Sequence, residues 1–188
     1  MKRFGLCLAI PAAYFFALSV APSTLSAGTP VTYTENDRPL FTISVPDFWA
    51  VRTGGVRLLE DPETGEVGET GRILGLSPEA EGESIVGFVS PAGVSDLQGG
   101  IEYLDYIGPF LVKDAKATEP VERRVGGMPA VSFSGDGTRN GRRVNFTALV
   151  VDIPKGRVVV AVVVIEATVA PELVGQMNEL LGSIRVAR

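Results

Sequence analysis

The chain contains no histidine and a single cysteine, Cys7, among its 188 residues. Cys7 lies in an apolar N-terminal run, so a form of the protein that loses this run has neither a thiol nor an imidazole. Catalytic sets of the serine–histidine or cysteine–histidine type are excluded, and so are most transition-metal sites, which depend on these ligands. Without paired cysteines, the fold must be stabilised by packing and not by disulfide bonds.

Residues 1–27 have the composition of a secretory signal peptide. Two basic residues come first, an apolar run follows as far as Ala21, and small residues lead to a cleavage position after Ala27. We expect the remaining residues, 28–188, to form a single domain that is exported to the periplasm. An uncleaved membrane anchor is the alternative, because the apolar run is at the lower limit of length for spanning a bilayer.

The charge balance argues against nucleic acid as a partner. Acidic residues outnumber basic residues by 22 to 17, and the net charge at pH 7 is −5. Phosphate backbones and anionic membrane surfaces repel such a chain, and after cleavage we expect no stable membrane insertion. Acidic residues dominate positions 28–112 and basic residues positions 113–157. This division fits either two solvated faces or a polarised surface that orients a protein partner.

The hydrophobic pattern predicts strands, a helix, further strands and a closing helix. Helical spacing begins after a capping box formed by Ser95 and Gln98, and glycine and proline at 108–109 are expected to end or kink this helix. A Gly-Gly pair at 126–127 predicts a tight hairpin, and the apolar stripe of residues 171–181 predicts the closing helix.

Residues 158–165 decide the expected architecture. All eight are apolar and nearly all are β-branched, which favours a strand over a short helix. A strand without a polar side is buried on both faces, so its sheet needs a covering layer on each side. The sequence therefore predicts an α+β fold with a mainly antiparallel sheet.

Three segments carry recognisable motifs. Residues 41–49 read Phe-Thr-Ile-Ser-Val-Pro-Asp-Phe-Trp, residues 127–130 read Gly-Met-Pro-Ala, and residues 177–185 read Met-Asn-Glu-Leu-Leu-Gly-Ser-Ile-Arg. They resemble the opening strand, a turn and the closing helix and strand of PsbP-like proteins, a group that includes the extrinsic photosystem II subunit and DcrB-like exported bacterial proteins. The resemblance implies an α/β/α sandwich around a mainly antiparallel sheet. It also implies roles in binding and assembly, without shared catalytic residues.

The densest basic group flanks two consecutive predicted turns and consists of Arg123, Arg124, Arg139, Arg142 and Arg143. Guanidinium groups bind carboxylates through paired hydrogen bonds, so these arginines are candidates for contact with an acidic envelope protein. The alternative interpretation is that their charges protect strand edges against aggregation.

The densest acidic group consists of Glu60, Asp61, Glu63, Glu66 and Glu69. Carboxylate oxygens suit calcium, but the spacing lacks the order of a preformed calcium loop, which favours a solvated loop. Paired carboxylates can also hydrolyse glycosidic bonds. A carboxylate-based or cation-dependent periplasmic hydrolase is therefore the alternative function.

Trp49 is the only tryptophan, and we expect it in the core or at its rim, not as an exposed anchor for a partner. The preferred function is that of an exported, non-enzymatic binding or assembly accessory protein of the cell envelope. It would act through contacts with an unknown envelope protein. We predict no catalytic residue, no metal and no cofactor.

Overall fold

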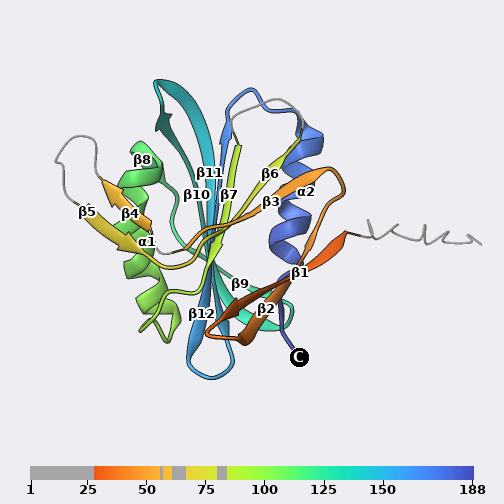
Figure 1. Cartoon of the computed structure of the whole chain (residues 1–188). Helices are drawn as coiled ribbons and strands as arrows, with labels where there is room; N and C mark the ends of the chain where they lie inside the picture. The colour runs from red at the N-terminus through yellow and green to blue at the C-terminus, as the bar shows by residue number, and fades with distance from the viewer. Residues whose placement is uncertain (1–27, 56, 61–66, 80–83) are drawn as a thin grey trace, which may run out of the picture.

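The fold is built around one large antiparallel sheet with a helix on each face (Figure 1). The computed structural model describes residues 28–55, 57–60, 67–79 and 84–188. Helix α1 (Leu97–Leu111) covers one face and helix α2 (Pro171–Gly182) covers the other. The predicted α+β class with a mainly antiparallel sheet is confirmed. The expected signal peptide lies outside the described residues.

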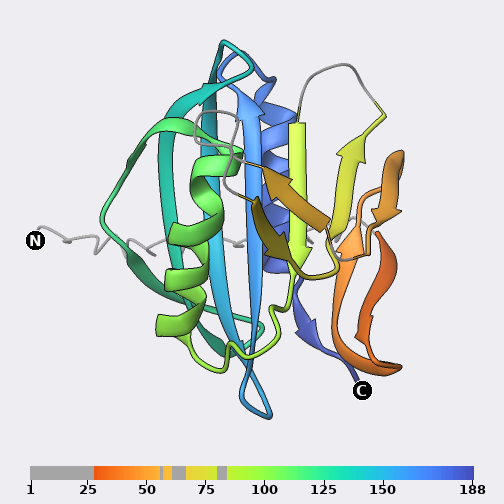
Figure 2. The same cartoon turned by 60° about the vertical axis from the view of Figure 1, so that its left-hand side comes forward.

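The large sheet contains eight strands. Across the sheet the order is β3 (Trp49–Thr53), β6 (Leu74–Pro78), β7 (Ser84–Val89), β12 (Arg157–Glu166), β11 (Arg142–Ile153), β10 (Met128–Arg139) and β8 (Lys113–Ala117), and β9 (Val121–Val125) also pairs with β10. Figure 2 shows α1 in front of β10, β11 and β12, with which it is in contact.

Two smaller sheets accompany the large one. The first has the order β1 (Thr29–Glu35), β2 (Arg38–Val45) and β13 (Arg185–Val186), and in the second β4 (Arg57–Glu60) pairs with β5 (Val67–Thr70). Strand β2 contacts α2, so the first small sheet and α2 cover the same face of the large sheet.

The central strand β12 separates the two hydrophobic layers. It pairs with β7 on one side and with β11 on the other. Because alternate side chains of a strand point to opposite faces, Val158 and Val160 pack under α1 while Val159 and Ala161 face α2. The prediction of a strand buried on both faces is correct along most of its length. Val162 is the exception, since it is only half-buried on the α1 side.

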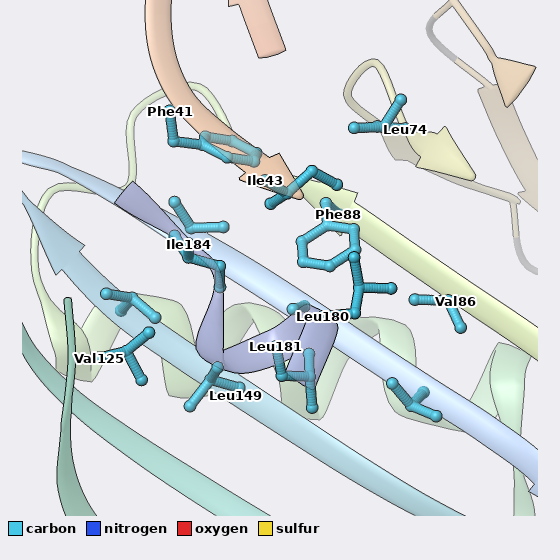
Figure 3. Packing of buried hydrophobic residues seen from close by; sticks show 14 of the residues in the cluster. Phe41, Ile43, Leu74, Val86, Phe88, Val125, Leu149, Leu180, Leu181 and Ile184 are labelled. Carbon is cyan, nitrogen blue, oxygen red and sulfur yellow. The ribbon is translucent and has the colours of Figure 1, made fainter. Parts of the chain in front are cut away.

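The larger hydrophobic layer lies between the sheet, α2 and β2 (Figure 3). Phe41 of β2 is completely buried there, close to Phe88 of the large sheet. Its ring stacks on that of Tyr33, with 4.8 Å between the two ring centroids. Burial raises the pKa of the Tyr33 phenol. The hydroxyl therefore stays protonated at neutral pH, and it donates a hydrogen bond of 2.8 Å to the carbonyl of Arg72.

Helix α1 differs from the prediction at both ends. The capping box of Ser95 and Gln98 is wrong, because the N-cap is Asp96, whose carboxylate accepts a 2.8 Å hydrogen bond from the Gly99 amide. Aspartate satisfies a free N-terminal amide as well as serine does. The helix also continues past Pro109 to Leu111. A proline so close to the end removes only one backbone donor from the last turn.

Two glycines of α1 differ in their surroundings. A Cβ atom on Gly100 would lie 2.3 Å from Cγ1 of the completely buried Val150, whereas one on Gly108 would have no described atom within 4 Å. We expect Gly100→Ala to lower the free energy of unfolding by about 1–3 kcal/mol, because the helix must move away from the sheet. Gly108→Ala should change it by less than about 1 kcal/mol, because the gain in helix propensity is opposed by contact of the new Cβ atom with the ring of Pro109. Urea unfolding of both variants measures this difference, and a stabilised Gly100→Ala variant would contradict the close packing.

Candidate functional site: a groove between helix α1 and the sheet

A groove of about 500 Å³ lies between the C-terminal half of α1 and the large sheet. Its floor is formed by side chains from β10, β11 and β12, namely Phe133, Phe146, Ala148 and Val162. Residues of α1 form one wall and the first residues of β8 form the other. The volume falls within the range of roughly 300–1,000 Å³ that is usual for small-molecule sites.

The groove lies beyond a close contact between the first turns of α1 and the sheet. Gly100 brings the helix backbone against Val150, and the floor beyond this contact is left partly uncovered. Phe133 and Phe146 are only half-buried, although they lie on interior strands of the sheet. The Phe146 ring lies across Gly135 of β10, where a Cβ atom would be only 2.6 Å from Cζ of the ring.

Arg139 holds the end of the helix that forms the groove wall. Its Nη1 atom donates a 2.6 Å hydrogen bond to the carbonyl of Leu111. This contact satisfies a free helix carbonyl and places a positive charge at the negative end of the helix dipole. Val112 follows as the C-cap, packed so closely on β10 that a Cβ atom on Gly137 would lie 2.4 Å from its Cγ1. The junction of α1 and β8 is thereby fixed.

The chemical character of the groove suits binding. The charged residues that line it are Asp105, Lys113 and Asp114, and both aspartates are exposed. In the part of the chain that the structure describes, histidine, cysteine and acidic side chains do not come together in a group of three that could hold a metal ion. The site is mainly an apolar surface with charged groups beside it, which is the usual composition of a ligand pocket.

The five arginines identified in the sequence do not form one patch. Arg123 and Arg124 lie on β9, opposite the first residues of β10, whereas Arg139, Arg142 and Arg143 lie at the hairpin between β10 and β11. At about 3.3 Å per residue, the length of β10 places these two groups roughly 30 Å apart. An acidic partner would have to contact one group or the other.

Most of these arginines already have partners within the protein. Arg142 forms an ion pair with Glu166, Arg124 donates to the carbonyl of Gly127 at 2.8 Å, and Arg139 holds α1. The described residues offer no side-chain hydrogen bond or ion pair to Arg143. Binding of an acidic partner by these arginines stays a prediction, and Arg143→Glu tests it without breaking a described contact.

The remaining predictions from the sequence concern Trp49 and the acidic group. Trp49 is buried, as expected, with 8% of its surface exposed, and its indole N–H donates to Oε1 of Gln176 at 3.0 Å. Asp61, Glu63 and Glu66 lie outside the described residues, as do the side chains of Glu60 and Glu69. The expectation of a solvated loop there, with a cation site as the alternative, stays a prediction.

Sequence reasoning missed the residues of the groove floor. Along β11, Phe146, Ala148 and Val150 alternate on one apolar face, a pattern that predicts core positions for all three. Val150 is buried because α1 covers it, whereas Phe146 lies beside the groove and is only half-buried. The residue pattern of β11 does not indicate how much of the strand the helix covers.

Comparison with known proteins identifies the fold. No family model and no curated protein matches the chain. LpqN of Mycobacterium tuberculosis, described as involved in cell envelope biogenesis, is 18% identical, with 85% of this chain and 90% of LpqN covered and a TM-score of 0.50. PA94 of Pseudomonas aeruginosa, a protein of unknown function, is 14% identical, with 86% and 99% covered and a TM-score of 0.46. At such identities, the similarity to LpqN shows a shared fold.

Among the described residues, neither α1 nor α2 has the length and apolar character of a helix that crosses a membrane.

Proposed function

We propose that the protein is a non-enzymatic accessory protein of the cell envelope that binds an apolar group in the groove beside α1. The half-buried floor supports this proposal most strongly. Phe133, Phe146 and Val162 present apolar surface inside a cavity, whereas folding alone would favour their complete burial. LpqN shares the fold and is described as involved in envelope biogenesis, which supports the envelope as the place of action.

We also propose that the protein is exported to the periplasm and that it belongs to the PsbP-like group. Residues 1–27 would act as a signal peptide that delivers the protein to the periplasm. The fold would be that of the PsbP-like group, and the motifs at 41–49 and 177–185 support this assignment. The bound apolar group would belong to an envelope component, and the protein would act by contact and not by catalysis.

Filling the groove from the helix side tests the proposal. Gly108 lines the groove, and apart from its neighbours along the helix a Cβ atom there meets no described atom within 4 Å, so Gly108→Leu should insert a side chain into the cavity. The matched control is Gly175→Leu on α2, where a Cβ atom likewise meets no described atom. Both changes replace glycine in a helix, which favours folding, but at position 108 this gain is opposed by contact with the ring of Pro109. Gly175→Leu should therefore melt at or above the wild-type temperature, and Gly108→Leu close to it.

The neutral dye N-phenyl-1-naphthylamine, which fluoresces in apolar surroundings, serves as the probe. We expect saturable binding to the wild type and to Gly175→Leu, and a loss of at least about tenfold in affinity for Gly108→Leu, because its side chain occupies the cavity. Equal binding by all three proteins would show that the dye sits elsewhere and that the groove is not the site.

A further inference from the structure

The turn between β2 and β3 holds an aromatic side chain in solvent. Phe48 is 82% exposed, and its backbone has a φ of +62°, in the left-handed region that bulky residues rarely adopt. Glycine or asparagine would fit this backbone with less strain. Neither burial nor backbone preference therefore explains a phenylalanine at this position.

Contacts on both sides of Phe48 fix this conformation. Its own carbonyl accepts a 2.9 Å hydrogen bond from the amide of Glu79, which follows β6. The next residue, Trp49, is buried and its indole is hydrogen-bonded to Gln176 of α2. Because the backbone is held at these two points, the fold presents the phenyl ring outward.

Beside the ring lies a hollow of about 470 Å³. Val169 and Leu173 give it an apolar surface, and its charged lining is acidic, with Asp47, Glu166 and Glu172. Glu166 is neutralised by its ion pair with Arg142. No described residue pairs with Asp47 or Glu172, so these two carboxylates leave the hollow negatively charged.

We propose that Phe48 and this hollow form a docking site for a segment of a partner protein in which apolar side chains are flanked by arginine or lysine. The apolar side chains would bury the surface of Val169 and Leu173, as in the centre of a protein interface. The flanking cations would face Asp47 and Glu172, and a guanidinium group would stack on the Phe48 ring. The hollow contains residues of α2, whereas the groove lies beside α1, so this inference does not depend on what the groove binds.

The single tryptophan provides a local measurement, since Trp49 lines the hollow. The probe is a synthetic peptide with leucines flanked on both sides by arginines. In one comparison peptide glutamates replace the arginines, and in a second alanines replace the leucines. We expect a saturable change in Trp49 emission with the arginine–leucine peptide alone. Its affinity should fall at least about threefold between 0.05 and 0.3 M salt, because added salt shortens the Debye length.

Variants assign the binding to the hollow. Phe48→Gly should lower the affinity for the arginine–leucine peptide at least about tenfold. Its melting temperature should not fall, because glycine fits the strained backbone at this position. Asp47→Asn combined with Glu172→Gln should weaken it at least about threefold. The matched control, Glu119→Gln combined with Glu122→Gln, removes the same charge near β9 and should bind as the wild type does.

Several results would overturn the proposal. These are no saturable response to the arginine–leucine peptide, an equal response to either comparison peptide, or unchanged affinity in both the Phe48 and the carboxylate variants. If Phe48→Gly melts at a lower temperature than the wild type, its binding result is set aside. The peptide affinity of the Asp47→Asn, Glu172→Gln variant then decides whether the hollow is the binding site. Ultracentrifugation of the unliganded protein provides a further check, because a dimer that Phe48→Gly abolishes would assign the surface to a second copy of the chain instead.

Discussion

Val160→Asp is expected to lower the free energy of unfolding by at least about 3.5 kcal/mol. Val160 is 1% exposed on the central strand under α1. The variant loses the burial of a valine, worth about 1.5–3 kcal/mol, and places an unpaired carboxylate among apolar side chains at a cost of about 2 kcal/mol or more. The total is a large part of the free energy of unfolding of a typical domain, which is about 5–15 kcal/mol. We therefore expect a marked fall in the melting temperature.

Val162→Asp is the control for this result. Val162 lies on the same strand and faces the same side, but it lines the groove and is half-buried. Its carboxylate should remain hydrated, and we expect less than about half of the loss seen at position 160. Equal losses in the two variants would show that the groove floor is as dry as the core.

Phe41→Ala is expected to lower the free energy of unfolding by about 3–5 kcal/mol, the usual cost of truncating a buried phenylalanine. The Phe41 ring is completely buried between the small sheet and the large one, and its stacking on Tyr33 would also be lost. Urea unfolding measures the loss. Phe41→Leu keeps most of the apolar volume and should cost less than about 1.5 kcal/mol.

A small effect of Phe41→Ala would have a clear meaning. If the loss were under about 1 kcal/mol, the small sheet of β1, β2 and β13 would be able to open separately while the large sheet stays folded. A loss within the expected range, in one cooperative transition, would show that both sheets share one core.

Much of the fold follows from local patterns. The apolar run at 158–165 correctly predicts a central strand, and the Gly126–Gly127 pair correctly predicts a hairpin, where both residues have positive φ values of 58° and 84°. The closing helix is also correct, and Met177, Leu180 and Leu181 of its apolar stripe are buried, although Val174 is exposed. In each of these cases, the residues of one short segment are enough to determine its secondary structure.

The sites depend on contacts between distant segments, and this is why the sequence did not predict them. The groove is set by how Gly100 meets Val150, and no pattern within α1 or β11 specifies that contact. The arginines are close in sequence, yet Arg123 pairs with Ala130 near the start of β10 whereas Arg139 lies at the end of that strand. Phe48 lies between the buried Val45 and Trp49, and only its backbone conformation turns it outward.

Strands β8 and β9 form one edge of the large sheet, and each pairs with a different part of β10. Both are short, and they carry charged residues at Lys113, Asp114, Lys116, Glu122, Arg123 and Arg124. An interrupted edge with such side chains is a poor template for an incoming strand. Growth of the sheet by strand addition, which leads to fibrils and to strand-swapped dimers, is therefore disfavoured on this side of the molecule.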